Sequence, residues 1–170
     1  MNFLFVGNPG TGKTTVATLL AAAMVELGYR KNPIPVITSA NDILSEQDPA
    51  ATFQTMVQSA ENGTLFIDEA YHFNPAPRGS TANASNKVLD YLMKISETKR
   101  DSITFILAGY KEEILQLLTY NPGFPSRFPR ELMFNFPDYT ESQICNIFKT
   151  MVKSRNFRLE SKKECGVSIA

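Results

Sequence analysis

The sequence predicts an α/β fold, in which helices cover a mostly parallel β-sheet. Two observations carry this prediction. Short apolar runs such as TFILA (104–108) recur along the 170-residue chain, and stretches with helical patterning separate them. These runs are continuous rather than alternating, which is typical of parallel strands covered on both faces.

The first half of the chain supplies two strands and two helices. The run NFLFV (2–6) predicts a buried strand, and 13–27 predicts a helix that ends at Gly28, a residue typical of helix ends. The segment PVIT (35–38) predicts a short strand, and the stretch over about 50–61 is helical.

The middle of the chain repeats this alternation. The run TLFID (64–68) predicts a strand, because the turn residues Asn62 and Gly63 precede it. The composition of residues 74–85 predicts a loop. A predicted helix follows over about 86–98, and after it the strong strand ITFILAG (103–109).

The last part supplies one more helix, over about 111–118, and a final strand candidate, ELMFNF (131–136). Thr140 and Gln143 then form a T-x-x-Q pattern, which predicts the start of another helix. Apolar residues follow at helical spacing: Ile144, Ile147, Phe148, Met151 and Val152. We expect this helix to bury its apolar face and to begin a second, mostly absent subdomain.

Composition and charge exclude several classes of function. The chain has 43% hydrophobic and 20% charged residues, as a globular domain does. Its 17 basic and 17 acidic residues balance, so no nucleic-acid partner is expected. Cys145, Cys165 and His72 are too few for a zinc site or a disulfide framework. Without a spanning segment or signal sequence, we expect a soluble intracellular protein, cytoplasmic and without a membrane partner.

The stretch GNPGTGKTT (7–15) satisfies G-x-x-x-x-G-K-[ST], the Walker A pattern. Its glycines let backbone N–H groups converge on phosphate oxygens, and the N-terminus of the following helix favours the same negative charge. Lys13 would reach the β- and γ-phosphates, and the Thr14 hydroxyl would bind Mg²⁺. The predicted nucleotide-binding residues are Gly7, Asn8, Pro9, Gly10, Thr11, Gly12, Lys13, Thr14 and Thr15. The strand before and the helix after disfavour the alternative, a glycine-rich turn with an accidental lysine.

The stretch LFIDEAYHF (65–73) places Asp68 and Glu69 at the end of an apolar strand. Asp68 there can hold Mg²⁺ with Thr14, and Glu69 can activate an attacking water as the catalytic base. An acidic pair that merely faces solvent is the alternative. Because the pair follows a Walker A pattern in an α/β chain, the catalytic interpretation is favoured.

Other phosphate-loop classes lack support. GTPases need N-K-x-D, and NKVLD (86–90) has one residue too many. No LSGGQ-like stretch of transporter ATPases occurs. The tetrapeptide DEAY is similar to the motif of DEAD-box helicases, but their arginine-rich Q-R-x-G-R-x-x-R element is missing.

Arg127 and Arg130 stand in an R-F-x-R arrangement before the last strand. With this element the chain resembles the AAA+ ATPases, and among them the CbxX/CfqX branch of red-type Rubisco activase and stage V sporulation protein K relatives. The phrases that carry the resemblance are GNPGTGKTTVA, LFIDEAY, ILAGYKEE and NPGFPSRF, within about residues 2–158.

The resemblance implies a three-layer P-loop NTPase with sheet order 5-1-4-3-2. Residues 1–138 would form the AAA+ core without its N-terminal helix, and 139–170 the beginning of a truncated helical lid. It also implies hydrolysis of ATP with Mg²⁺, remodelling of a protein client, and a homo-oligomeric ring, usually a hexamer. Arg127 is the first candidate for an arginine finger donated to the neighbouring subunit and Arg130 the second, since a guanidinium stabilises transition-state charge. Surface charges or internal ion pairs are the alternative for both.

Two departures from the family pattern leave alternatives open. The polar residue that usually ends the fourth strand would fall near Gly109 or Tyr110, and neither is an Asn. The pore-loop region, 41–53, is shortened and lacks an aromatic before Phe53, which we expect to pack in a helix. His72 is expected to be a loop or capping residue. A nucleotide-binding interaction module without motor activity therefore remains an alternative, and a nucleic-acid-translocating ATPase is disfavoured.

Overall fold

The computed structural model of the chain describes residues 1–74, 83–155 and 157. The chain divides into two compact units, Met1–Pro137 and Asp138–Ala170, which are described separately. Most of the loop expected over 74–85 lies outside the described residues, as does Cys165.

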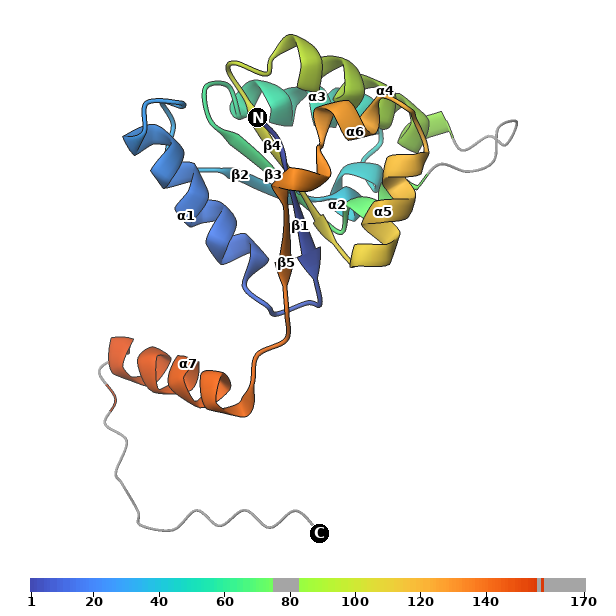
Figure 1. The fold of residues 1–170 in the computed structure, drawn as a ribbon. Coiled ribbons are helices and arrows are strands. Elements are labelled where there is room, and N and C mark those ends of the chain that lie inside the picture. The colour runs from blue at the N-terminus through green and yellow to red at the C-terminus, as the bar shows by residue number, and fades with distance from the viewer. Residues whose placement is uncertain (75–82, 156, 158–170) are drawn as a thin grey trace. The chain divides into compact units, whose positions relative to one another are not determined.

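The first unit is built on a sheet of five parallel strands in the order β2-β3-β4-β1-β5 (Figure 1). The strands are β1 (Phe3–Gly7), β2 (Val36–Ser39), β3 (Thr64–Asp68), β4 (Thr104–Gly109) and β5 (Met133–Phe136). The predicted order 5-1-4-3-2 is the same order counted from the other edge, so it is confirmed.

The helices and 3-10 turns lie between these strands. They are α1 (Lys13–Glu26), α2 (Ala40–Leu44), α3 (Pro49–Ser59), η1 (Ala70–Phe73), α4 (Asn83–Thr98), α5 (Lys111–Thr119), α6 (Phe124–Arg127) and η2 (Arg130–Leu132). Figure 1 shows α1 on one face of the sheet and α3, α4, α5 and α6 on the other. The central strands β1, β3 and β4 are therefore covered on both faces.

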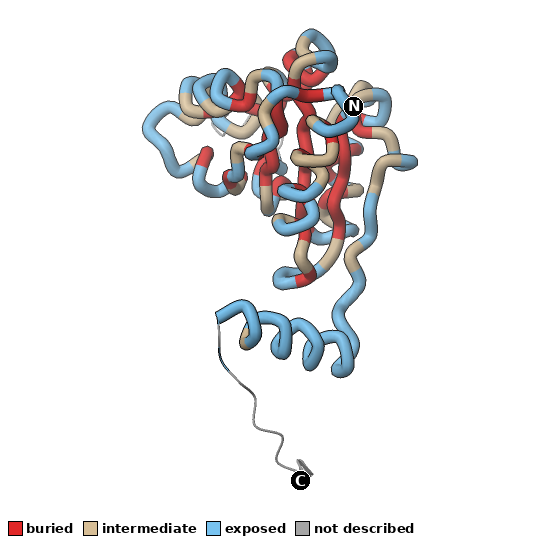
Figure 2. The backbone as a smooth tube through the Cα atoms, turned by 90° about the vertical axis from the view of Figure 1, so that its left-hand side faces the viewer, coloured by how far each residue is buried: buried red, intermediate tan, exposed pale blue. Residues whose placement is uncertain are grey.

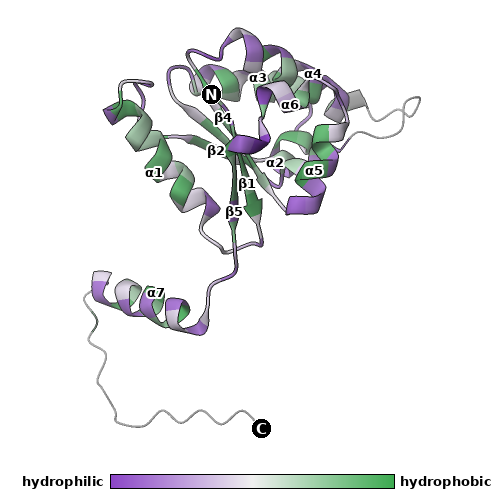
Figure 3. Cartoon of the chain, in the orientation of Figure 1, coloured by the Kyte–Doolittle hydropathy of each residue, from purple (hydrophilic) through white to green (hydrophobic). Residues whose placement is uncertain are grey.

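Burial follows from this layering. All six residues of β4 are buried, and so are the first four of β1 and of β3 (Figure 2). Figure 3 shows β1 in the green of hydrophobic residues. Apolar runs without alternation are therefore what this sheet requires. The residue expected to pack in a helix, Phe53, is fully buried in α3.

The start of one helix and several short elements differ from the predictions. The helix expected from residue 86 begins at Asn83, and the region 41–53 contains a helix, α2, that was not predicted. The Ser39 hydroxyl caps α2 by accepting a hydrogen bond from the Asp42 N–H at 3.1 Å. A helix of five residues makes little more than one turn, so its apolar periodicity cannot be recognised in the sequence. The same reason applies to η1, α6 and η2.

The carboxyl ends of β1, β3 and β4 lie at one edge of the sheet because the strands are parallel. In the register of the sheet, Val6 of β1 pairs with Gly109 of β4, and Gly7 pairs with Phe136 of β5. In open parallel sheets this edge is where ligands bind. It brings together segments that are about 40 to 100 residues apart in the sequence.

The second unit contains one described helix, α7 (Glu141–Ser154). The predicted capping box is present, since Thr140 and Gln143 bond each other's backbone N–H groups. The expectation that this helix buries its apolar face is wrong for the described residues: Ile144, Phe148 and Met151 are 55%, 57% and 51% exposed. A lone helix has no second described element in its own unit to pack against. None of the described helices combines the length and apolarity that a membrane span needs.

Candidate nucleotide site

The glycine-rich loop leaves β1 in a conformation that only glycine allows. A Cβ on Gly7 would collide with the carbonyl oxygen of Phe136 on the neighbouring strand. Gly10 and Gly12 have φ values of 80° and 90°, where other residues are strained. The Thr11 hydroxyl donates to the Asn8 carbonyl at 2.7 Å and braces the turn. The glycine conformations and the Thr11 hydrogen bond therefore fix the shape of the loop.

Lys13 places its charge inside this loop. Its side chain is only 7% exposed, and its ammonium donates to the carbonyl oxygens of Gly7 at 2.9 Å and Asn8 at 2.8 Å. The helix α1 begins at the same residue, and Gly12 at its N-cap offers no side-chain hydrogen bond. The first N–H groups of α1 therefore add their positive end to the lysine charge, which suits a phosphate.

The acidic pair stands at the end of β3. Asp68 is the last strand residue, and its Oδ1 accepts a hydrogen bond from the Glu69 N–H at 2.9 Å. Glu69 has a left-handed backbone with φ 49°, an uncommon conformation for a residue with a side chain. The chain thus turns sharply after Asp68, and Glu69 is exposed. His72 lies in η1, with its Nε2 3.7 Å from Oε2 of Glu69.

The structure brings the loop and the acidic pair together around one pocket of about 330 Å³. The predicted residues that line it are Gly7, Pro9, Gly10, Gly12, Lys13, Thr14, Thr15, Asp68 and Glu69. Asn8 and Thr11 belong to the same loop but do not line the pocket.

Three further residues line this pocket: Tyr71, Gly109 and Tyr110. The sequence did not identify Tyr71 as a site residue, whereas Gly109 and Tyr110 lie where the family pattern places a polar residue. The two tyrosine rings lie 5.6 Å apart between centroids. Burial, followed by the charges of Glu69 and Glu113, raises the pKa of Tyr71 above the ordinary value of a phenol. The phrases LFIDEAY and ILAGYKEE contain these residues, but nothing in the phrases says that they meet.

The residues present fit a magnesium ion that accompanies a nucleotide. The Thr14 hydroxyl and the Asp68 carboxylate line the same pocket. Among the described residues no group of three or more His, Cys, Asp or Glu side chains could hold a metal. Mg²⁺ is commonly bound by one or two protein oxygens together with substrate phosphates, so two protein oxygens suffice.

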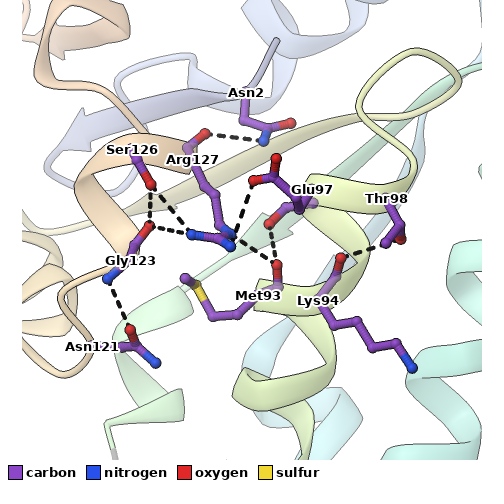
Figure 4. A network of polar contacts seen from close by, with 10 residues as sticks. Asn2, Met93, Lys94, Glu97, Thr98, Asn121, Gly123, Ser126 and Arg127 are labelled. Atoms are coloured by element: carbon purple, nitrogen blue, oxygen red, sulfur yellow. Dashed lines mark hydrogen bonds and ion pairs between the residues drawn. The ribbon is translucent and has the colours of Figure 1, made fainter.

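The two arginines differ in their contacts. The Arg127 guanidinium donates to the carbonyl oxygens of Met93 at 3.1 Å and Gly123 at 3.0 Å, and it lies 3.5 Å from the carboxylate of Glu97 (Figure 4). Its side chain is 26% exposed. Arg130 is exposed, and its side chain makes no hydrogen bond or ion pair with the described part of the chain.

Neither arginine lies at the pocket of its own chain. The Asn2 side chain, just before β1, donates to the Arg127 carbonyl at 3.0 Å, so α6 lies at the amino end of the strands. The pocket lies at their carboxyl end. At about 3.3 Å per residue, the five residues of β1 separate the two ends by about 13 Å.

A parallel sheet of this order, with a glycine-rich lysine loop after β1 and an acidic pair after β3, defines the P-loop class of nucleotide-binding proteins. The chain belongs to the AAA family, the "ATPase family associated with various cellular activities", which it matches over residues 3–136.

Individual relatives agree with the resemblance to the CbxX/CfqX branch. The chain is 34% identical to Stage V sporulation protein K of Bacillus subtilis over 166 residues, which cover 96% of this chain and 50% of that protein. It is 32% identical over 170 residues to Protein CfxQ of Xanthobacter flavus, with 98% and 52% covered. It is also 32% identical over 166 residues to the chloroplastic ribulose bisphosphate carboxylase/oxygenase activase of Cyanidioschyzon merolae, with 96% and 55% covered. The chain thus spans about half the length of these relatives.

Proposed function

We propose that the chain binds ATP with Mg²⁺ in this pocket and hydrolyses it to ADP and phosphate. One observation carries the proposal: the lysine loop, Thr14, Asp68 and Glu69 line the same pocket, although the loop and the acidic pair are more than 50 residues apart. Membership of the AAA ATPase family supports the same activity.

Each residue has a role that follows from its chemistry. The loop N–H groups and Lys13 hold the β- and γ-phosphates, and Thr14 and Asp68 hold the metal ion. When bound, Mg²⁺ neutralises phosphate charge. Glu69 accepts a proton from the water that attacks the γ-phosphate. The exposure of Glu69 and its sharp turn leave the carboxylate accessible to that water.

We propose that an arginine of a neighbouring subunit completes the site in a homo-oligomeric ring. The distance of Arg127 and Arg130 from the pocket of their own chain supports a role in trans. Because the guanidinium of Arg127 is bonded within its own chain and that of Arg130 is not, the contacts favour Arg130 as the donated group. Arg127 then anchors the segment that presents it.

The work done with ATP is proposed to be the remodelling of a protein client. The name of the Cyanidioschyzon merolae relative describes an activase of another enzyme, which supports a client of this kind. The second unit is proposed to be the beginning of a helical lid. One observation favours the alternative, a nucleotide-binding interaction module: Phe53, the only aromatic residue in 40–53, is fully buried and offers no exposed ring for gripping a client.

Titration calorimetry with Mg–ATP and Mg–ADP, combined with a steady-state ATPase assay, tests the proposal. Binding with turnover supports it. Binding without turnover in oligomeric protein favours the interaction module. Stimulation of turnover by single-stranded DNA or RNA would favour the nucleic-acid-translocating class instead. Absence of nucleotide binding by folded protein would refute the assignment of the pocket.

A further inference from the structure

The end of β4 lies at the pocket that is proposed to bind the nucleotide. Gly109 ends this strand and pairs in register with Val6, the residue just before the phosphate loop. It also lines the pocket beside Asp68 and Glu69. A glycine has no side chain, so the end of β4 contributes no polar side chain to the pocket at this position.

The ring of Tyr71 occupies the space that such a side chain would take. A Cβ built on Gly109 would lie 2.8 Å from Cδ1 of Tyr71 and 3.2 Å from Cδ1 of Ile114. These contacts are too close for any residue larger than glycine without a shift of its neighbours. The absence of a side chain at Gly109 therefore leaves room for the ring of Tyr71.

The surroundings of Tyr71 keep its ring in place. Its ring lies 4.6 Å from the His72 ring and 5.6 Å from the Tyr110 ring, measured between centroids. Tyr71 follows Glu69 by two residues within the turn that η1 makes. It lines the pocket, and its hydroxyl has no hydrogen-bond partner in the described parts of the chain. A phenol can donate one hydrogen bond to a phosphate oxygen.

We propose that the Tyr71 hydroxyl binds the γ-phosphate, and so supplies from the turn after β3 the polar contact that Gly109 at the end of β4 cannot make. The contact distinguishes ATP from ADP, since ADP has no oxygen at that position. This inference rests on the proposed function, because it requires that the pocket binds a nucleoside triphosphate.

Calorimetry with Mg–ATPγS and Mg–ADP tests the proposal without requiring turnover or assembly. Tyr71→Phe keeps the ring against Gly109 and removes only the hydroxyl. We expect affinity for Mg–ATPγS to fall about tenfold or more, as for a lost hydrogen bond to a charged group, while affinity for Mg–ADP and the melting temperature stay unchanged. Tyr29→Phe removes a phenol that is 58% exposed and does not line the pocket, and it should change neither affinity.

The outcomes separate this inference from the proposed function. Wild-type protein that binds neither nucleotide refutes both. If the wild type binds both and Tyr71→Phe keeps the same ratio of affinities, only the role of Tyr71 is refuted. A selective loss in Tyr110→Phe but not in Tyr71→Phe would also overturn the assignment, in favour of the neighbouring phenol.

A second measurement uses the wild-type chain. The protein has six tyrosines and no tryptophan, so tyrosine labelled with ¹³C at Cζ gives a simple spectrum. The Tyr71 resonance is the one that Tyr71→Phe removes. We expect Mg–ATPγS to shift this resonance from its position in the Mg–ADP complex. Identical positions in the two complexes would refute the contact.

Discussion

The ammonium of Lys13 lies 2.9 Å from the carbonyl oxygen of Gly7, six residues earlier in the chain. The lysine therefore spans its own loop and places a nearly buried positive charge at the pocket. Lys13 thus supplies the charge of the loop, whereas the glycines allow its backbone conformation.

Replacement of this lysine should abolish binding far more than it perturbs folding. Lys13→Ala removes the only charged side chain of the phosphate loop, so we expect affinity for Mg–ATP to fall about 100-fold or more, with a small change in melting temperature. Calorimetry and a thermal melt measure the two effects together. Lys31→Ala, at an exposed position away from the pocket, is the matched control. Unchanged affinity in folded Lys13→Ala protein would contradict the assignment of the loop.

The two residues of the acidic pair should affect nucleotide binding and ATP hydrolysis differently. Glu69→Gln keeps the size of the side chain but removes the base, so Mg–ATP should bind normally while turnover falls about 10²-fold or more. Asp68→Asn should instead weaken the dependence of binding on Mg²⁺. Calorimetry at several Mg²⁺ concentrations and a phosphate-release assay distinguish the two variants. Normal turnover by Glu69→Gln would show that another residue activates the water.

Arg127 should contribute to stability even where no neighbour is present. Arg127→Ala removes the hydrogen bond to the Met93 carbonyl, which joins α6 to α4, and the hydrogen bond to the Gly123 carbonyl at the start of α6. The free energy of unfolding should therefore fall by about 1–3 kcal/mol. Glu97→Gln removes only the ion pair with a half-exposed carboxylate and should cost less than about 1 kcal/mol. Urea unfolding measures both values. Equal losses in the two variants would mean that the ion pair, and not the backbone contacts, holds the segment.

Mixing experiments should show which arginine acts on a neighbour. Arg130→Ala retains its own pocket but lacks the donated group, whereas Glu69→Gln has the opposite defect. Mixed oligomers contain some interfaces where an intact pocket meets an intact arginine, so two nearly inactive variants should recover ATPase activity on mixing.

Light scattering must first show that mixed oligomers form and that the wild-type protein turns over ATP. Arg127→Ala in place of Arg130→Ala is the comparison. Full activity of Arg130→Ala alone would exclude Arg130 and leave Arg127 as the candidate, as the sequence first suggested.

The strands and the phosphate loop could be predicted because their signals are local. Continuous apolar runs identify β1, β3 and β4, and shorter mixed segments predicted the edge strands β2 and β5. The loop and the acidic pair are contiguous motifs whose residue types carry the chemistry. The order of the strands came from the family resemblance, and the structure confirms it. Short elements such as α2 and α6 have no periodicity to detect.

The contacts that complete the site could not be predicted, because each joins distant parts of the chain. Tyr71 meets Gly109 across 38 residues, and Arg127 meets Met93 across 34. Neither pair has a sequence signature, since a tyrosine in a turn and an arginine near a strand have many possible partners. The exposure of the apolar residues of α7 also depends on the other elements of the second unit. The sequence pattern of the helix does not reveal those elements.

The close approach of Gly7 to Phe136 links the phosphate loop to the end of β5. The phosphate loop begins at Gly7, whose backbone leaves no room against the peptide of Phe136, and the first unit ends one residue later at Pro137. Any side chain at position 7 would therefore displace the carboxyl end of β5 as well as the phosphate loop. The pairing of the edge strand β5 and the shape of the nucleotide pocket thus depend on the same glycine.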